Sequence, residues 1–336
     1  MRLSVLGAGS WGTTLAHLFQ KNGHSVRLWA FEPEVVKGIR DLRKNPFYVP
    51  NLDIAPGLFV TNDLRECLEK PDGILFALPS NHVRRMANEV RPMISGNPGI
   101  LNAAKGLEPQ SGKRLSEVLL ESLGIAADSS EDRVAVLSGP NLATEIASGK
   151  IGATVVASPN DTWNQLLQEA LASSKFRVYR HSDRIGVELG GTLKNVFAIG
   201  AGIVDGLDLG DNAKAAYLTR SLHEMVRLGV RLGGRPATFY GLSGLGDLMA
   251  TAMSPLSRNH QMGQALARGR RAEFQKESSR MVVEGIETTR TAREWGKKLT
   301  IPMPITEEIY RVLFEEKSPR DAAKDLMTRS LKDEES

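Results

Sequence analysis

Short apolar runs alternate with helical patterns in the part of the chain that precedes residue 182. This alternation is typical of a parallel β-sheet covered by helices, because parallel strands need crossover connections and are buried on both faces. The runs that predict buried strands are residues 3–7, 25–29, 73–78, 99–104, 133–139 and 153–158. The first half of the chain is therefore predicted to be α/β, with a mostly parallel sheet.

Beyond residue 185 the chain shows long helical patterns such as "NAKAAYLTRSLHEMVRLGVRLG", and no further strand is expected. The chain has 336 residues, whereas single hydrophobic cores stop growing at about 250–300 residues. We therefore predict two domains: an α/β domain over residues 1–184 and an all-α C-terminal domain over residues 185–336.

Composition and charge exclude several classes of protein. Hydrophobic residues make up 41% of the chain and charged residues 24%, as in an ordinary globular protein. The net charge of only +4 argues against nucleic acid as a partner. No apolar run reaches the roughly 18–20 residues of a membrane span, and no export leader precedes the first strand. A single cysteine, Cys67, cannot form an internal disulfide, so a cytoplasmic protein is expected. The six histidines lack metal-ligand spacing, so no metal is expected.

A glycine-rich turn follows the first strand and opens a helical pattern. It reads "GAGSWG" and comprises Gly7, Gly9 and Gly12, with Ser10 and Trp11 between them. Glycines at this spacing permit a tight turn, close approach of the backbone to a pyrophosphate, and tight helix packing. The helix N-terminus attracts the anion. Because the motif lies within a strand–turn–helix–strand unit, it predicts a Rossmann-like dinucleotide-binding domain.

The end of the second predicted strand indicates which cofactor binds. Glu32 lies where a carboxylate accepts hydrogen bonds from the ribose hydroxyls of NAD, and Phe31 is placed to lie against the adenine. A 2′-phosphate would meet like charge there, with no arginine before Arg40. NAD is therefore expected, with NADP less favoured. In the alternative interpretation, Glu32 belongs to an acidic helix N-terminus.

The stretch "ELGGTLKN" places Lys194 on a helix face of small residues that includes Gly191 and Ala198. A glycine inside a helix costs about 1 kcal/mol relative to alanine, so these glycines are poor choices for stability alone. One interpretation is a surface lysine that extends from an apolar helix. The other is a functional lysine, with the small face leaving room for substrate and nicotinamide.

Long motifs resemble those of the NAD(P)-dependent glycerol-3-phosphate dehydrogenases over nearly the whole chain. They are "VLGAGSWGTTLA", "NAAKGLE", "LSGPNLATE", "ELGGTLKNVFAIGAGIVDGLDLGDNAKAA", "GLSGLGDLMAT", "SRNHQMG", "VVEGIETTR" and "PMPITEEIYRVLF". The resemblance implies hydride transfer between NAD(P)H and dihydroxyacetone phosphate, which yields sn-glycerol 3-phosphate for phospholipid synthesis. It also implies that the helical domain binds substrate and carries catalytic residues.

The resemblance gives three residues catalytic roles. Lys194 matches the general acid/base, and Lys105 matches a lysine that touches cofactor and substrate. Asp247 matches the carboxylate that anchors the substrate or the lysine. A ketone that accepts hydride becomes an alkoxide, which an ammonium can protonate. The alternatives are that Lys105 merely ends a strand and that Asp247 merely forms a turn after glycines.

Other positions match binding residues of the same family. Those expected to bind substrate, beside Lys105, Lys194 and Asp247, are Gly139, Asn141, Ser257, Arg258 and Asn259. Those expected near the cofactor, beside the glycine turn and Lys105, are Phe31, Glu32, Ala143, Arg258, Val282 and Glu284. The sequence "SRN" suits a phosphate, although it could also be a helix cap followed by a surface arginine. At Asn141 the family usually has serine, so the contact is expected in altered geometry.

Two other functions stay open from the sequence. One is a related hydroxyacid dehydrogenase, and the other is a non-catalytic NAD-sensing regulator on the same scaffold. A small phosphorylated molecule is the expected substrate and partner, and the sequence leaves a homodimer open.

Overall fold

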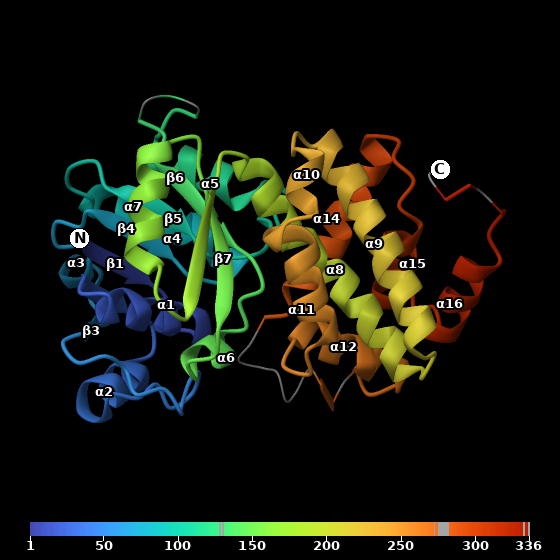
Figure 1. Cartoon of the computed structure of the whole chain (residues 1–336), viewed down its shortest axis with the longest axis horizontal. Coiled ribbons are helices and arrows are strands. Elements are labelled where there is room, and N and C mark those ends of the chain that lie inside the picture. Colours follow the sequence, from blue (N-terminus) through green and yellow to red (C-terminus); the bar gives the residue numbers. More distant parts are fainter. Residues whose placement is uncertain (128, 130, 272, 275–281, 332, 335–336) are drawn as a thin grey trace.

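The chain, described here from a computed structural model, forms two parts that lie side by side (Figure 1). The structure describes residues 1–127, 129, 131–271, 273–274, 282–331 and 333–334. The N-terminal part is an eight-stranded sheet covered by helices, and the C-terminal part is a helical bundle. This confirms the predicted class, an N-terminal Rossmann-like α/β domain followed by an all-α domain.

The sheet has the strand order β3-β2-β1-β4-β5-β6-β7-β8. The strands are β1 Arg2–Leu6, β2 Ser25–Trp29, β3 Phe59–Thr61, β4 Gly73–Phe76, β5 Gly99–Asn102, β6 Val134–Ser138, β7 Gly152–Ala157 and β8 Phe176–His181. All neighbouring pairs run parallel except β6 and β7. The strand order reverses between β1 and β4, and such a switch point opens a crevice at the carboxyl ends of the strands.

All six predicted strands are present, but two others were not predicted. β3 has only three residues, which is too short to show a pattern. β8 reads "FRVYRH" and has alternating burial, because it forms the edge of the sheet and exposes every second residue. Apolar runs indicate strands that are buried on both faces. An edge strand with alternating burial therefore lacks this pattern.

Helices cover both faces of the sheet. They are α1 Ser10–Lys21, α2 Pro33–Leu42, α3 Leu64–Cys67, α4 Val83–Val90, α5 Leu115–Leu123, α6 Ala143–Ala147 and α7 Asp161–Leu171. One apolar core includes Leu15 and Phe19 of α1 with Trp163 of α7. The other core includes Val83 of α4 and Leu119 of α5. The first core fixes α1 and its preceding glycine turn against the sheet.

The helical domain is built around α8, Arg184–Gly206, whose residues are buried over most of its length. Around it lie α9 Asp211–Arg231, α10 Pro236–Phe239, the π-helical turn η3 Leu242–Gly246, α11 Asp247–Met253, α12 Arg258–Ala267, α14 Glu284–Lys298, α15 Pro304–Phe314 and α16 Pro319–Met327. Among the described residues, α8 alone is long and apolar enough to cross a membrane, yet its apolar window is 100% buried inside the protein. It is therefore the core of this domain.

The small residues of α8 allow close packing with protein rather than room for a ligand. A Cβ on Gly191 would lie 2.1 Å from Ser138 Oγ of β6, and one on Gly190 would lie 2.9 Å from the Ser243 carbonyl oxygen. A Cβ on Gly202 would lie 2.0 Å from the His260 carbonyl oxygen of α12. The expectation that the small face leaves room for substrate and nicotinamide is therefore wrong for Gly190 and Gly191.

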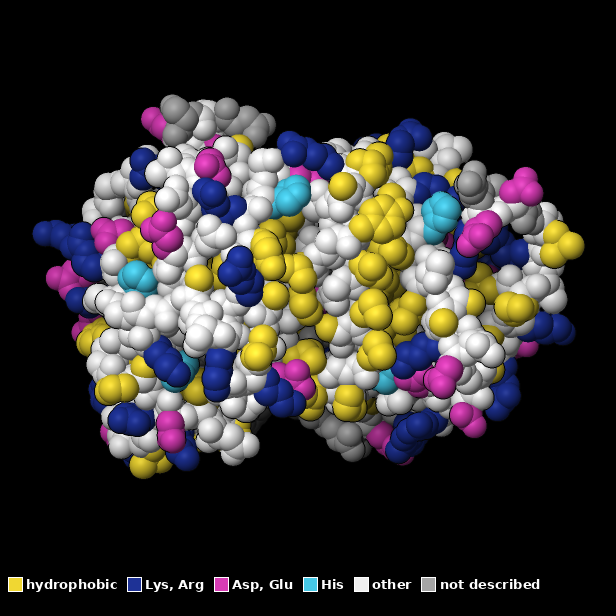
Figure 2. Space-filling model, viewed as in Figure 1, with side chains coloured by type: hydrophobic (Ala, Val, Ile, Leu, Met, Phe, Trp, Pro, Cys, Tyr) yellow, Lys and Arg dark blue, Asp and Glu magenta, His cyan; other side chains and the backbone are white. Residues whose placement is uncertain are grey.

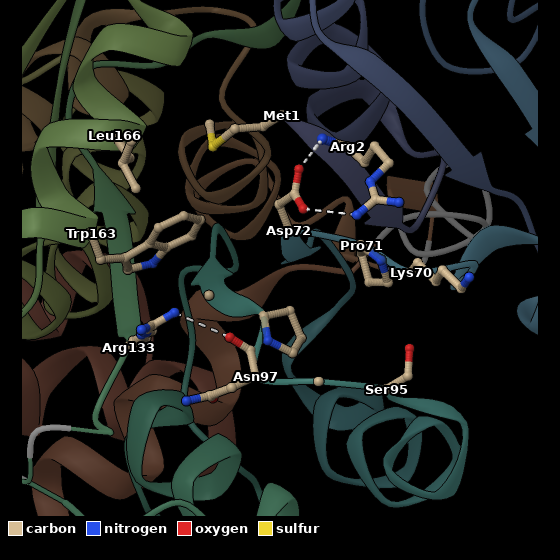
Figure 3. A pocket seen from close by; sticks show the side chains of 13 residues that line it. Met1, Arg2, Lys70, Pro71, Asp72, Ser95, Asn97, Arg133, Trp163 and Leu166 are labelled. Atoms are coloured by element: carbon tan, nitrogen blue, oxygen red, sulfur yellow. Dashed lines mark hydrogen bonds and ion pairs between the residues drawn. The ribbon is translucent and has the colours of Figure 1, made fainter.

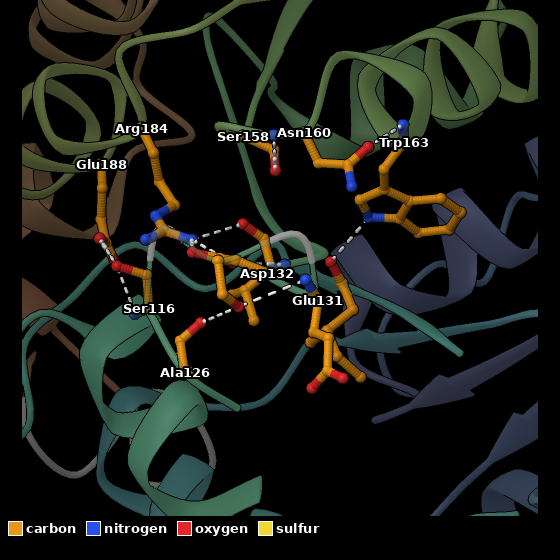
Figure 4. A network of polar contacts seen from close by, with 12 residues as sticks. Ser116, Ala126, Glu131, Asp132, Ser158, Asn160, Trp163, Arg184 and Glu188 are labelled. Carbon is orange, nitrogen blue, oxygen red and sulfur yellow. Dashed lines mark hydrogen bonds and ion pairs between the residues drawn. The ribbon is translucent and has the colours of Figure 1, made fainter. Parts of the chain in front are cut away.

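Buried polar contacts hold the first turns of α8 against the sheet domain (Figure 4). Arg184 Nη1 donates to both carboxylate oxygens of Asp132, at 2.8 and 2.9 Å, and to the Val134 carbonyl oxygen at 2.9 Å. One turn later, the Glu188 carboxylate accepts from Ser116 N at 2.8 Å and from Ser116 Oγ at 2.5 Å. α8 is thus attached to β6 and α5 at the junction of the two domains.

Replacing Arg184 by methionine should lower the free energy of unfolding by about 3–5 kcal/mol, because the buried Asp132 carboxylate would lose its ion pair with the guanidinium. Urea denaturation measures the loss. The matched control is Arg180→Met, which breaks the exposed Arg180–Asp161 pair and should cost only about 0–1 kcal/mol. Equal losses in the two variants would show that the buried pair does not hold the junction.

Candidate active site

The glycine turn after β1 has the geometry of a dinucleotide-binding loop. Gly7 has φ 112°, in the region that favours glycine. A Cβ on Gly12 would lie 1.9 Å from the Gly7 carbonyl oxygen, so only glycine allows α1 to start this close to β1. Gly9 precedes α1, and a Cβ on it would meet no atom within 4 Å. No side chain caps α1, so its N-terminus suits an anion.

Ser10 and Trp11 lie at the start of α1. Ser10 Oγ donates to the Tyr48 carbonyl oxygen at 3.0 Å and so ties the turn to the loop after α2. The Trp11 ring stands edge-on to Phe176, with centroids 6.4 Å apart. Its indole N–H is buried and has no acceptor among the described residues. A buried donor without a partner is costly, which is consistent with a ligand acceptor at this position.

The end of β2 presents Glu32 and Phe31. Tyr48 donates its hydroxyl hydrogen to Glu32 Oε1 at 2.6 Å, which fixes the carboxylate. Glu32 occupies the position before α2, but its side chain caps no backbone N–H of that helix. Phe31 is 74% exposed, so its ring is free to lie against an adenine. Together these residues fit the adenosine end of NAD.

Two lysines share one buried carboxylate where the domains meet. Lys194 Nζ lies 3.0 Å from Asp247 Oδ1, and Lys105 Nζ lies 2.7 Å from Asp247 Oδ2. Lys194 also donates to Thr251 Oγ1 at 2.6 Å, and Lys105 donates to the Gly139 carbonyl oxygen at 2.8 Å. The side chain of Lys194 is only 9% exposed, which contradicts the interpretation of a surface lysine.

Each member of this cluster comes from a different element. Lys105 follows β5 at the carboxyl edge of the sheet, Lys194 is in the middle of buried α8, and Asp247 is the first residue of α11. The π-helical turn η3 precedes Asp247, and its Gly244 packs so closely that a Cβ would lie 2.0 Å from the Phe239 carbonyl oxygen. Asp247 is therefore more than a turn-forming residue, because its side chain joins the two domains.

Burial and charge set the protonation of the cluster. Burial lowers the pKa of Lys194 to about 8; the Asp247 carboxylate opposes this shift, and the Lys105 ammonium adds to it. Burial alone would raise the pKa of Asp247, but the Lys105 and Lys194 ammonium groups hold that pKa below its usual value. The carboxylate thus stays ionised while Lys194 titrates near neutral pH, as a general acid/base requires.

A chain of amides fixes the surroundings of the cluster. Asn195 Nδ2 donates to the Lys105 carbonyl oxygen at 2.9 Å, and Asn259 Nδ2 donates to Asn195 Oδ1 at 2.9 Å. Gly285 N donates to Asn259 Oδ1 at 3.0 Å. The amide of Asn259 is therefore bonded to protein at both ends. Ser257 Oγ accepts from His260 N at 3.3 Å and so caps α12. This agrees with the alternative interpretation of "SRN" as a helix cap.

Arg258, Val282 and Glu284 lie together beside this chain. Arg258 Nη1 donates to the Val282 carbonyl oxygen at 3.5 Å. The Glu284 carboxylate accepts from Ser80 N at 3.0 Å and from Ser80 Oγ at 2.5 Å, which joins α14 to the loop after β4. Burial raises the pKa of Glu284, against the opposing effects of the Ser80 hydrogen bonds and of Arg258. Burial also lowers the pKa of Arg258. A half-buried cation of this kind can hold an anion.

The loop after β6 carries Gly139, Asn141 and Ala143. Gly139 has φ 138°, and its carbonyl oxygen accepts from Lys105. Asn141 Nδ2 donates to the Ala153 carbonyl oxygen at 3.2 Å, and Thr154 Oγ1 donates to Asn141 Oδ1 at 3.0 Å. Since this amide is bonded to β7, its contact with substrate stays a prediction. Ala143 begins α6, and its carbonyl oxygen accepts from Thr14 of α1 at 3.5 Å.

Two cavities in the described part of the chain lie away from this cluster. The larger, about 600 Å³, lies at the amino ends of the strands and is lined by Arg2, Asp72, Arg133 and Trp163 (Figure 3). The smaller, about 350 Å³, lies between α2 and β3. The carboxyl edge remains the candidate site because the titrating lysine and the glycine turn both lie there. No group of three potential metal ligands occurs among the residues that the structure describes.

Sequence reasoning missed three residues of the site. Thr251 bonds Lys194 and also donates to Asp247 Oδ1 at 3.1 Å. Its position four residues after Asp247 on one helix was the available signal. Asn195 supports Lys105, and Tyr48 fixes Glu32. No local pattern indicates those two contacts, because they join residues that are far apart in the sequence or on separate elements.

Family models match both parts of the chain. The model described as the NAD-dependent glycerol-3-phosphate dehydrogenase N-terminus matches residues 2–164. The model described as the C-terminus of the same enzyme matches residues 183–324.

Full-length relatives match as well. A glycerol-3-phosphate dehydrogenase [NAD(P)+] of Syntrophotalea carbinolica is 45% identical to this chain over 334 residues, and the match covers 99% of each chain. The crystal structure of glycerol-3-phosphate dehydrogenase from Coxiella burnetii has a TM-score of 0.90 at 38% identity, with 98% of this chain and 99% of that chain covered. The enzyme of Saccharomyces cerevisiae has a TM-score of 0.83 at 26% identity, with 98% and 99% covered.

Proposed function

The chain belongs to the NAD-dependent glycerol-3-phosphate dehydrogenase family, and we propose that it interconverts dihydroxyacetone phosphate and sn-glycerol 3-phosphate. The observation that carries this proposal is the buried pair of lysines on Asp247, placed where the glycine turn and the helical domain meet. The product is the backbone of glycerophospholipids, so the reaction supplies their synthesis.

The residues at the carboxyl edge fit a nicotinamide dinucleotide. The glycine turn and the uncapped N-terminus of α1 suit its pyrophosphate, and the Trp11 N–H offers a donor. Glu32 and Phe31 suit the adenosine, with NAD favoured over NADP. Val282 and Glu284 are expected near the nicotinamide end, and Ala143 and Arg258 are also expected to contact the cofactor. The cofactor supplies or accepts the hydride.

Lys194 protonates the substrate oxygen during reduction. When hydride adds to C2 of the ketone, the C=O electron pair moves to oxygen, and the Lys194 ammonium gives that oxygen a proton. In the reverse direction the neutral amine of Lys194 removes the hydroxyl proton. Lys105 supplies a second positive charge near the oxygen and lowers the pKa of Lys194. Asp247 holds both ammonium groups, and Thr251 orients Lys194.

Arg258 binds the substrate phosphate at the start of α12. Its planar guanidinium forms charge-assisted hydrogen bonds with a dianion, and the N-terminus of α12 adds partial positive charge. Ser257 caps that helix, and Asn259 positions Asn195 beside Lys105. Gly139 and Asn141 complete the expected substrate pocket.

The remaining assignments follow from the same proposal. We place the boundary between the nucleotide domain and the helical domain at residues 184 and 185, where α8 begins. We further propose a cytoplasmic homodimer that does not use nucleic acid as a partner. A hydroxyacid dehydrogenase would not need the phosphate-binding Arg258, and a regulator would not need the paired lysines. Both alternatives are therefore less favoured.

The reaction should depend on pH in opposite ways in its two directions. Reduction needs the ammonium form of Lys194, so kcat/KM for dihydroxyacetone phosphate should fall as the pH rises through about 8. Oxidation needs the neutral amine, so kcat/KM for glycerol 3-phosphate should rise through the same pH. As a control, Lys194→Ala should lower turnover by about 10²–10⁴ and abolish this transition. An unchanged transition in that variant would assign it to another group.

NADH should be preferred over NADPH because the Glu32 carboxylate would repel a 2′-phosphate. Glu32→Ser should raise kcat/KM for NADPH at least tenfold relative to NADH. The matched control is Glu34→Ser, which removes a negative charge from the first turn of the same helix and should leave the ratio unchanged. A wild-type protein that uses NADPH as well as NADH would contradict the role of Glu32.

Replacing Arg258 by lysine keeps the charge but loses the forked donor, so KM for dihydroxyacetone phosphate should rise more than tenfold. Binding energy from the phosphate also positions the ketone, so kcat should fall too. Dihydroxyacetone, which lacks the phosphate, serves as the control substrate, and Arg268→Lys at the other end of α12 serves as the control variant. Equal slowing of both ketones would show that Arg258 does not bind the phosphate.

A further inference from the structure

The loop after α2, residues 43–54, packs firmly against the sheet domain. Ile54 N donates to the Arg43 carbonyl oxygen at 3.0 Å and so joins the two ends of the loop. Within the loop, Val49, Leu52 and Ile54 are buried in the apolar core that also holds α1. Because such cores are close-packed, the backbone of the loop is fixed, and a side chain that extends from it has a defined position.

This loop contacts both the glycine turn and the residue at the end of β2. Asn45 Nδ2 donates to the Ala8 carbonyl oxygen in the turn at 2.8 Å, and Ser10 Oγ donates to the Tyr48 carbonyl oxygen at 3.0 Å. The Tyr48 hydroxyl donates to Glu32 Oε1 at 2.6 Å. One loop therefore determines where the Glu32 carboxylate lies relative to the turn that suits a pyrophosphate.

The Glu32 carboxylate has a competing position at the start of α2. Glu32 precedes that helix, whose first N–H groups carry partial positive charge, yet its side chain caps none of them. Without another partner, the side chain would be free to rotate toward this helix end and away from a 2′-phosphate. The hydrogen bond from Tyr48 to Oε1 opposes that rotation and leaves Oε2 for a ribose hydroxyl.

Charges of both signs are mixed on the surface near α2, at the lower left of the face seen in Figure 2. Lys44 Nζ lies 3.9 Å from Asp53 Oδ1, and Arg40 Nη2 donates to the Val60 carbonyl oxygen at 3.2 Å. Protein acceptors thus engage these two cations. We therefore assign the discrimination against a 2′-phosphate to the Glu32 carboxylate and to whatever fixes it.

We propose that Tyr48 is a positioning residue that sets the preference of this chain for NAD over NADP by holding the Glu32 carboxylate in place. The hydroxyl acts through the carboxylate: a carboxylate that cannot turn aside must repel the 2′-phosphate. This inference rests on the NAD preference proposed above and adds a second residue to its cause. A tyrosine that only packed within the loop would affect the binding of both cofactors equally.

Binding of ADP-ribose and of ADP-ribose 2′-phosphate to the full-length chain tests the proposal without catalysis. The two ligands differ only in that phosphate, and isothermal titration calorimetry gives both dissociation constants. The wild-type protein should bind ADP-ribose about tenfold or more tightly, because like charges oppose each other in the other complex. Tyr48→Phe removes only the hydroxyl and should lower this ratio about three- to tenfold, as expected for the loss of one hydrogen bond.

Two controls separate positioning from packing. Tyr179→Phe removes the hydroxyl of an exposed tyrosine on β8 and should leave the ratio unchanged. In a Glu32→Ser background, Tyr48→Phe should change the ratio by less than about twofold, because the two residues act through one contact. A loss of packing in the loop would instead weaken the binding of both ligands by the same factor and leave the ratio as it is.

The outcomes distinguish this inference from the cofactor preference on which it rests. Equal binding of the two ligands by the wild-type protein would overturn selection by Glu32 and, with it, the role of Tyr48. A selective wild-type protein whose ratio is unchanged in Tyr48→Phe would overturn the role of Tyr48 alone. An equal effect of Tyr48→Phe with and without Glu32 would show that the hydroxyl acts on the ligand directly, which would overturn the positioning role.

Discussion

One buried carboxylate, that of Asp247, holds two ammonium groups between the domains. Two cations this close would repel each other in a buried site. The shared carboxylate holds both ammonium groups close together, but its single negative charge does not balance their two positive charges. Burial lowers the pKa of Lys194 to about 8, and the carboxylate opposes this shift. The two ion pairs therefore link the end of β5, α8 and α11.

Close packing of α8 makes that contact feasible. Gly190, Gly191 and Gly202 let η3, β6 and α12 approach the helix backbone, and the polar contacts of Arg184 and Glu188 attach its start to the sheet domain. Any side chain larger than hydrogen at these glycines would move neighbouring backbone or side chains. The glycines cost helix stability, and they allow η3, β6 and α12 to pack against the helix that carries Lys194.

The cofactor end and the substrate end of the site differ in how they are built. The dinucleotide loop is local: a strand, a tight turn and a helix N-terminus adjoin in sequence. The end with the two lysines is assembled from distant parts of the chain: Lys194 and Asp247 are separated by 53 positions, and Lys105 and Asp247 by 142. The side-chain amides of Asn195 and Asn259 stabilise this end of the site, because their hydrogen bonds link backbone and side-chain atoms of different elements.

The sequence by itself determined the six buried strands and the dinucleotide loop, and it predicted Lys194 as the general acid/base. Strand burial and glycine spacing are local properties, and the long motifs carried a family resemblance for Lys105, Lys194 and Asp247. Only the tertiary structure decided the edge strands β3 and β8, the partners Asn195 and Tyr48, and the packing of Gly191. These depend on which distant atoms come into contact, and side-chain periodicity along one element contains no information about atoms on another.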